Sequence, residues 1–290
     1  MQMNQCAPNV TDNSFTCFTY QQLKSIAKKF NQTSDEKITI SKRKDVLWKR
    51  IYEKMKYKCN DELCWANNDK MVERFRPKRP IEWHSNPREW LSNFDIQRVM
   101  VQYEKKYKTF KFLGVFPDDY DYKIFMNTCV AEELCKLDVA ELMKDNKYQL
   151  GMVFNTDPHY LGGSHWVAIY ANINESSDKY GFYYYDSNAQ KPSKYIIKLF
   201  NQIRAQLKTK KTKAGTKTGT KTGTKAGTKA GKEFTMSINN NKHQFKNTEC
   251  GMFSMNFIIN MLKQKNTFEM VCNIKTSDDE VFKLRNRYFN

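Results

Sequence analysis

Residues 251–263, GMFSMNFIINMLK, are apolar on nearly every face of the helix that they would form. Because such a helix has no polar side to turn toward water, we expect other elements to enclose it. A chain of 290 residues is long enough to build that core in one large domain or two modest ones. Its apolar content of 40% and aromatic content of 14% also exclude global disorder.

Helical and strand-like patterns alternate around this segment, which predicts an α+β fold. We expect helices at 89–106, 131–144, 192–207 and 278–288, strands at 109–116, 149–154, 165–173 and 180–186, and short strands at 233–238 and 242–246. Two further helices, at 19–30 and 43–57, precede a proline-bearing stretch at 75–88. The sequence therefore predicts an N-terminal helical arm domain, residues 1–80, and a catalytic-sized domain, residues 81–290.

Residues 208–232 repeat a short Lys/Gly/Thr unit and hold nine lysines and no acidic residue. They carry half of the net charge of +18, and regular glycines disfavour both helix and strand. We expect a disordered insertion. It is either a tolerated loop expansion or a basic tether for nucleic acid.

No secretory signal and no membrane span are visible, so we expect the eight cysteines to be free thiols in a reducing compartment. One of them would be catalytic. An alternative is zinc bound by the four N-terminal cysteines, although their spacing matches no familiar finger. These are Cys6, Cys17, Cys59 and Cys64, while Cys129, Cys135 and Cys272 read as core residues.

His165 and Asp186 are expected to meet at the open end of one β-hairpin. Two strand-like runs flank the polar loop 174–179, and a hairpin centred near Ser176 places residue 165 opposite residue 187, give or take one or two. A histidine beside a carboxylate is either a structural contact or the base and orienting group of a catalytic triad.

Cys250 stands where a loop meets the N-terminus of the apolar helix. Unpaired amides and the helix dipole there favour a thiolate. Its own N–H, with the side chain of Gln244, could stabilise an oxyanion, and Gly251 permits close approach. Taken alone, Cys250 would read as a small buried residue, but His165 and Asp186 favour catalysis.

The order His165-Trp166, Asp186-Ser187, Gln244 and Cys250-Gly251 resembles the SUMO/ubiquitin-like-protein-specific cysteine proteases. The earlier segment Trp90-Leu91-Ser92-Asn93-Phe94-Asp95-Ile96 resembles the Trp-Leu motif that opens their catalytic domain. Their viral relatives include the adenovirus protease and the maturation proteases of large cytoplasmic DNA viruses, such as African swine fever virus protease. The resemblance covers roughly residues 90–290 and implies a central mixed sheet flanked by helices, behind a helical arm.

The resemblance also implies the chemistry. Cys250 would be the nucleophile, His165 the general base and then acid, and Asp186 its orienting group. Gln244 would line the oxyanion hole. The residues expected to contact substrate, in a slot that admits only Gly-Gly, are Trp166, Gly251, Trp90 and Asn93.

The function that follows is a thiol endopeptidase that cleaves viral structural polyproteins after Gly-Gly during virion maturation, in the virion and the cytoplasmic viral factory. It would need no cofactor or metal, bind no membrane, and contact DNA non-specifically through its basic surface. The alternatives are an isopeptidase for SUMO or ubiquitin conjugates and a non-catalytic nucleic-acid-binding scaffold.

One position in the triad stays open, because Asn188 lies two residues from Asp186 and an Asn fills the third place in the swine fever relative. We take His159 and His243 as surface histidines without a catalytic role.

Overall fold

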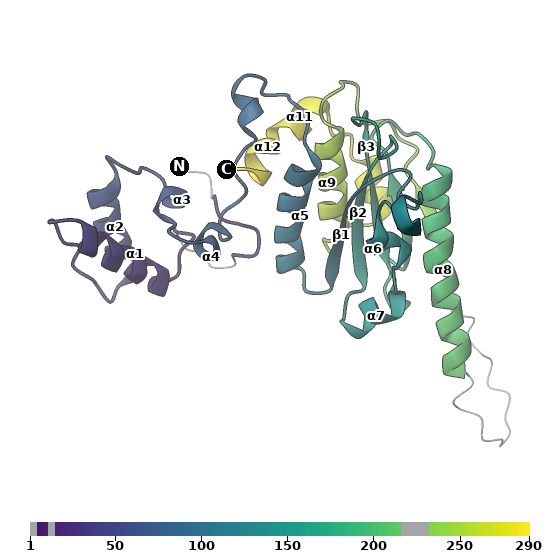
Figure 1. Ribbon diagram of the computed structural model, residues 1–290, viewed down its shortest axis with the longest axis horizontal. Coiled ribbons are helices and arrows are strands. Elements are labelled where there is room, and N and C mark those ends of the chain that lie inside the picture. The colour runs from purple at the N-terminus through teal and green to yellow at the C-terminus, as the bar shows by residue number, and fades with distance from the viewer. Residues whose placement is uncertain (1–4, 11–14, 216–231) are drawn as a thin grey trace, which may run out of the picture. The chain divides into compact units, whose positions relative to one another are not determined.

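The computed structural model describes residues 5–10, 15–215 and 232–290 (Figure 1). These residues form two compact units. The first comprises the chain up to Arg79 together with Asn286–Asn290, and the second comprises Pro80–Arg285. Assigning these regions to an arm and a protease domain stays a prediction. The last five residues, however, belong to the compact unit that the N-terminal region forms.

The first unit is helical, with α1 (Tyr20–Thr33), α2 (Lys44–Met55), α3 (Glu62–Trp65) and α4 (Asp69–Val72). Thr19 and Gln22 form a reciprocal capping box that starts α1. The apolar residues at the centre of the two predicted patterns are buried together in the core of this unit, which confirms both helices: Leu23, Ile26, Ala27, Leu47 and Ile51. Residues 286–290 complete the unit, since the Asn290 N–H donates to the Pro77 carbonyl and the Arg79 N–H donates to the Asn290 carbonyl.

A five-stranded mixed sheet forms the centre of the second unit. Its order is β1 (Phe110–Pro117), β2 (Gln149–Asn155), β3 (Trp166–Asn172), β4 (Gly181–Tyr185) and β5 (Met236–Ile238). The β1–β2 and β4–β5 pairs are parallel, and the two central pairs are antiparallel. Every residue of β3 is buried, as expected for the middle strand. The predicted α+β class and mixed sheet are confirmed.

Helices cover both faces of this sheet (Figure 1). On one side lie α5 (Asn93–Lys106) and α9 (Cys250–Met261), and on the other lie α6 (Glu132–Cys135), α7 (Val139–Lys144) and α8 (Lys194–Gly215). Ten of the twelve residues of α9 are buried, so the helix that is apolar all round is enclosed as predicted. The remaining elements are η1 (Ile81–His84), η2 (Phe125–Asn127), α10 (Phe268–Asn273), α11 (Asp278–Lys283) and α12 (Arg285–Tyr288).

Local capping explains where helix boundaries differ from prediction. The helix expected from residue 89 begins at Asn93, because Ser92 and Asp95 form a capping box there. The helix expected over 131–144 is two helices, since Asp138 accepts the N–H groups that start α7. The strand expected at 242–246 is wrong, because those residues lie outside all the strands described.

The insertion expected at 208–232 is also wrong at its start. Helix α8 continues to Gly215, well beyond the predicted end at 207. Extending an existing helix costs little free energy, and no glycine lies within the helix between Lys194 and Gly215. Residues 216–231, where the rest of the expected disorder falls, lie outside the described residues.

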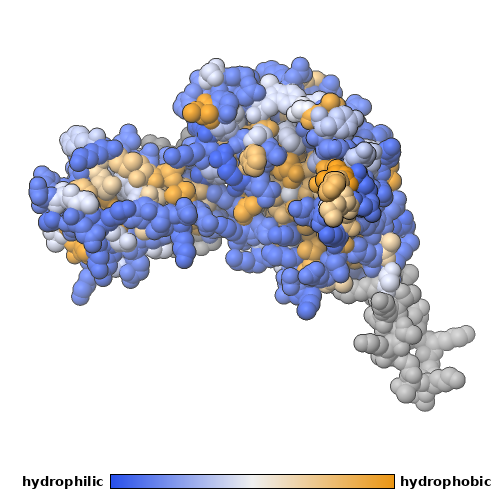
Figure 2. Space-filling model, in the orientation of Figure 1, coloured by the Kyte–Doolittle hydropathy of each residue, from blue (hydrophilic) through white to orange (hydrophobic). Residues whose placement is uncertain are grey.

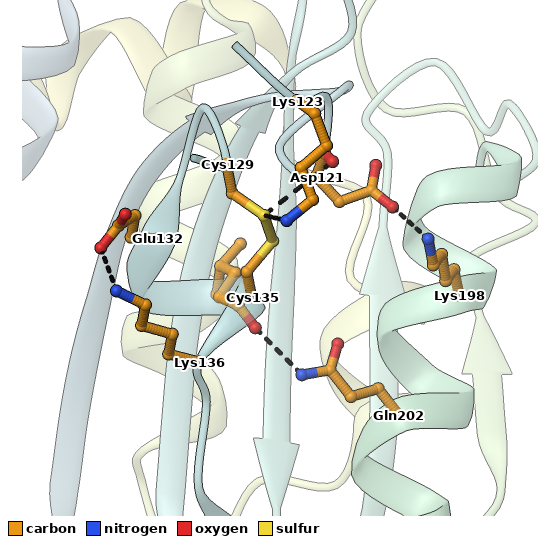
Figure 3. Close-up of a disulfide and its surroundings, with 9 residues drawn as sticks. Asp121, Lys123, Cys129, Glu132, Cys135, Lys136, Lys198 and Gln202 are labelled. Atoms are coloured by element: carbon orange, nitrogen blue, oxygen red, sulfur yellow. Dashed lines mark hydrogen bonds and ion pairs between the residues drawn. A yellow bond between two sulfur atoms is a disulfide. The ribbon is translucent and has the colours of Figure 1, made fainter. Parts of the chain in front are cut away.

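Six cysteines form disulfides, so the expectation of free thiols was wrong for them. The pairs are Cys6–Cys17, Cys59–Cys64 and Cys129–Cys135. The first two consume all four thiols of the zinc alternative. Figure 3 shows the third pair beside α8, where the Gln202 amide donates to the Leu134 carbonyl at 3.0 Å.

The surface seen in Figure 2 is mostly hydrophilic. Among the residues that the structure describes, no helix has both the length and the apolar character needed to cross a bilayer.

Candidate active site

His165 and Asp186 meet at one edge of the central sheet. Their strands are antiparallel, with Ala168 opposite Tyr185, so continuing the register places residue 165 opposite Asn188, one position from the predicted partner. His165 precedes β3 and Asp186 follows β4, which brings both to the same edge. The His165 Nε2 lies 2.6 Å from Asp186 Oδ1.

Asp186 is held rigidly as the partner of this histidine. Its side chain is 1% exposed, and its carboxylate accepts the backbone N–H groups of Asn188 at 2.7 Å and Gln190 at 3.3 Å. The Asn188 side-chain nitrogen lies 3.5 Å from the same His165 nitrogen. Of the two candidates for the third position, Asp186 makes the shorter, charge-assisted contact.

Cys250 is the first residue of α9 and is a buried free thiol. The helix is fixed against the start of β3, because the Ser254 hydroxyl donates to the Trp166 carbonyl at 3.2 Å. This contact brings the helix N-terminus to the residue that follows His165. The thiol therefore faces free backbone amides and the positive end of the helix dipole.

The interactions at the site favour the protonated form of the His165 imidazole. Burial lowers the pKa of His165, but hydrogen bonds to Asp186 and Cys250, together with their negative charges, outweigh burial and raise it to about 9. Because Nε2 faces Asp186, Nδ1 is the nitrogen left to exchange a proton with Cys250.

Gln244 is buried and is held beside Ser187, the residue that follows Asp186. Its Oε1 accepts the Ser187 hydroxyl at 2.7 Å, and its Nε2 donates to the Lys246 carbonyl at 2.6 Å. The second hydrogen of Nε2 is left for another acceptor. Sequence reasoning missed the role of Ser187, whose only signal was its place directly after Asp186.

The four expected substrate contacts differ in exposure. Trp166 is buried, and its indole N–H donates to the Leu91 carbonyl at 3.1 Å. Gly251 is buried beneath both residues, since a Cβ there would lie 3.2 Å from Leu91 Cδ1 and from Trp166 Cδ1. Trp90 is partly exposed, and Asn93 is exposed at the start of α5. Gly251 thus contacts these side chains rather than an open slot.

The expectation that His243 lies on the surface was wrong. It is 6% exposed, and burial lowers its pKa. Nε2 donates to the Cys272 main-chain carbonyl at 3.0 Å and Nδ1 accepts from the Tyr185 hydroxyl at 2.7 Å, so both nitrogens are used. Burial raises the pKa of the Cys272 thiol to about 12, which makes it a poor nucleophile.

His159 is exposed in the loop before β3, as expected. Its Nδ1 lies 2.7 Å from Asp119 Oδ2. Neither of the two free cysteines, Cys250 and Cys272, is a hydrogen-bond partner of this second His–Asp pair.

Among the described residues, no three His, Cys, Asp or Glu side chains gather where a metal ion could bind.

A free thiol at a helix N-terminus, an imidazole and a buried carboxylate together define the class of the cysteine proteases. The family model for the Ulp1 protease family, C-terminal catalytic domain, matches residues 130–290. The chain belongs to the Ulp1 protease family and is a cysteine protease.

Two relatives are viral. A protein named as a thiol protease in Acanthamoeba polyphaga mimivirus is 30% identical over 316 residues, covering 99% of this chain and 93% of the relative. The SUMO-1 cysteine protease of African swine fever virus is 24% identical over 206 residues, covering 69% and 67%.

A solved structure shares the fold. The crystal structure of the African swine fever virus protease matches with a TM-score of 0.63 at 20% identity, covering 99% of this chain and 96% of that chain. That likeness shows the fold alone.

Proposed function

We propose that this chain is the endopeptidase that cleaves viral structural polyproteins after Gly-Gly, with Cys250, His165 and Asp186 as its triad. The observation that carries the proposal is the position of His165, whose Nε2 lies 2.6 Å from Asp186 Oδ1 and whose pKa is raised by its interactions with both Asp186 and Cys250. Acyl transfer to a thiolate requires a thiol, a base that interacts with it, and a carboxylate that orients the base.

In the proposed reaction, His165 holds the proton that Cys250 has given up, and the thiolate attacks the carbonyl carbon of the scissile peptide bond. Imidazolium then donates that proton to the leaving amine, and the C–N bond breaks to give a thioester. Water, deprotonated by His165, hydrolyses the thioester and restores the thiol. Asp186 keeps the ring oriented through both steps.

The negative oxygen that forms during attack would be stabilised by two donors. One is the Cys250 backbone N–H at the start of α9, and the other is the second Nε2 hydrogen of Gln244. Ser187 holds Gln244 from the opposite side, so the donor is already oriented before substrate binds.

The close packing of Leu91 and Trp166 over Gly251 supports specificity for glycine. The indole of Trp166 is tied to Leu91, so this wall cannot open by a simple side-chain rotation. Trp90, which precedes Leu91 and is partly exposed, would extend this wall, and a narrow slot there would favour residues that lack a side chain. Asn93 would contact the substrate where α5 begins.

The substrate class and location rest on the viral relatives. A protease shared by mimivirus and African swine fever virus supports a role in virion maturation, within the virion and the cytoplasmic viral factory. The net charge of +18 supports non-specific contact with DNA there.

The test is cleavage of a Gly-Gly-x fluorogenic peptide by wild type, Cys250→Ala and the matched control Cys272→Ala, with and without iodoacetamide. We expect activity only in wild type and Cys272→Ala, and loss of both after alkylation. Folded wild type without activity, even on full-length polyprotein with DNA added, would refute the proposal.

A parallel arm uses SUMO and ubiquitin conjugates, because one relative is named a SUMO-1 cysteine protease. We expect faster cleavage of the viral polyprotein. Preference for a conjugate would identify the chain as an isopeptidase and leave the triad assignment intact.

A further inference from the structure

Arg285 and Glu249 form a buried ion pair that the proposed chemistry does not use. The Arg285 Nε–H donates to Glu249 Oε2 at 3.0 Å, and the two side chains are 3% and 0% exposed. Removing both charges from water is costly, so such a pair is weak evidence of a contribution to stability. We therefore look for the role of this ion pair in the segments that it connects, rather than in a contribution to stability.

Glu249 directly precedes Cys250 and is the N-cap residue of α9. Its side chain does not cap the helix but extends toward two arginines. Oε1 accepts from the Thr248 hydroxyl at 3.1 Å and from Arg88 at 3.3 Å, while Oε2 faces Arg285. The carboxylate thus fixes the peptide that leads into the nucleophile.

Arg285 joins that peptide to a second segment. Its Nη1 donates to the carbonyls of Pro87 at 3.1 Å and Glu89 at 2.8 Å, and its Nη2 donates to the Thr248 carbonyl at 3.4 Å. The guanidinium also lies 4.2 Å from the centre of the Trp83 ring. A planar group with five fixed donors suits this bridge, whereas a lysine ammonium does not.

The second segment leads into the proposed substrate slot. Trp90 and Leu91 follow Glu89 in the chain, and Leu91 packs over Gly251 and accepts the Trp166 indole N–H. The Arg285 guanidinium therefore connects the segment that precedes Cys250 to the segment that precedes Leu91.

We infer that Arg285, together with Glu249, is a positioning residue that holds Cys250 in register with the wall formed by Leu91 and Trp166. The inference rests on the proposed function, which identifies Cys250 as the nucleophile. Arg285 is buried and its donors are occupied by protein acceptors, so it does not touch substrate. Its loss should therefore lower kcat and leave KM nearly unchanged.

The test compares Arg285→Lys with the matched control Arg204→Lys. Arg204 also pairs with a glutamate, Glu233, and lies over an aromatic ring, that of Phe200, but on α8. We expect Arg285→Lys to lower kcat at least about tenfold, with KM within about threefold, because small misplacements of reacting groups are expensive. Alkylation of Cys250 by iodoacetamide should slow in parallel, whereas Arg204→Lys should change neither rate.

A folded Arg285→Lys variant with wild-type kcat and wild-type alkylation would overturn the inference. If that variant fails to fold, Glu249→Gln, which keeps the size of the side chain, is measured in the same way, and an unchanged kcat again overturns it. Alkylation is followed by peptide mass spectrometry at Cys250, separately from Cys272. If wild type cleaves no Gly-Gly peptide, the proposed function fails, but the alkylation rates still test the positioning role.

Discussion

Asp186 and Asn188 both approach His165, and their different distances decide what each substitution should do. Asp186→Asn removes the charged partner at 2.6 Å and lets the ring adopt the wrong tautomer, whereas Asn188→Ala removes a contact at 3.5 Å. We expect Asp186→Asn to lower kcat/KM at least about 100-fold and Asn188→Ala to change it less than about fivefold. Peptide cleavage kinetics measure both, and the reverse order would give Asn188 the orienting role.

The raised pKa of His165 makes stability depend on pH at this residue. A folded-state pKa of about 9, above the ordinary 6.5, means that folding favours the protonated ring. That contribution is fully present below pH 6.5 and is lost as the pH rises through 9. We expect Tm to fall over this interval more in wild type than in Asp186→Asn, measured by differential scanning fluorimetry. Equal profiles would contradict the assigned cause.

At the scale of single elements, the Cys129–Cys135 disulfide closes a short loop that ends in α6. Replacing both cysteines by alanine frees this loop in the unfolded chain. We expect the free energy of unfolding to fall by about 2 kcal/mol, as loop-closure entropy predicts for so short a span. Urea titrations of the two proteins, each without reductant, give the difference, and an unchanged midpoint would show that the bond adds no stability.

Among the single helices and strands, some could be predicted from the sequence and others could not. The register of the hairpin can be predicted from period-two alternation and a polar loop alone. The predicted partner of residue 165, residue 187, is one position from the partner that the observed register gives. Helix α9 needs only its composition. The start of α5 depends on one Ser–Asp capping box, which a pattern read over many residues does not resolve.

Two expectations were wrong because tertiary contacts, which the sequence pattern does not reveal, decide the outcome. Cysteine pairing depends on which thiols the fold brings together, and the expectation of a reducing compartment carries no such information. His243 is polar by type, yet Tyr185 and the Cys272 carbonyl satisfy both its nitrogens in the core. The residues next to His243 in the sequence do not reveal either of these partners.

At the scale of the whole molecule, the charge of +18 predicts salt-dependent binding to DNA. Residues 216–231 contain four of the lysines. Deleting them should weaken binding and make the slope of log affinity against log salt shallower by up to about four. Filter binding at several salt concentrations measures the slope. An unchanged slope would exclude these lysines as a tether while leaving the protease assignment untouched.

The first compact unit is built from both parts of the chain that flank the second. Residues up to Arg79 are made first, but Tyr288 and Phe289, which are 3% and 1% exposed, are made only after Pro80–Arg285 is complete. The first unit therefore cannot complete its core until the whole of Pro80–Arg285 has been made. We therefore expect that the usual order, in which the N-terminal unit finishes folding first, does not apply to this chain. A chain that ended at Arg285 would contain every strand of the described sheet, yet its first unit would lack the buried Tyr288 and Phe289.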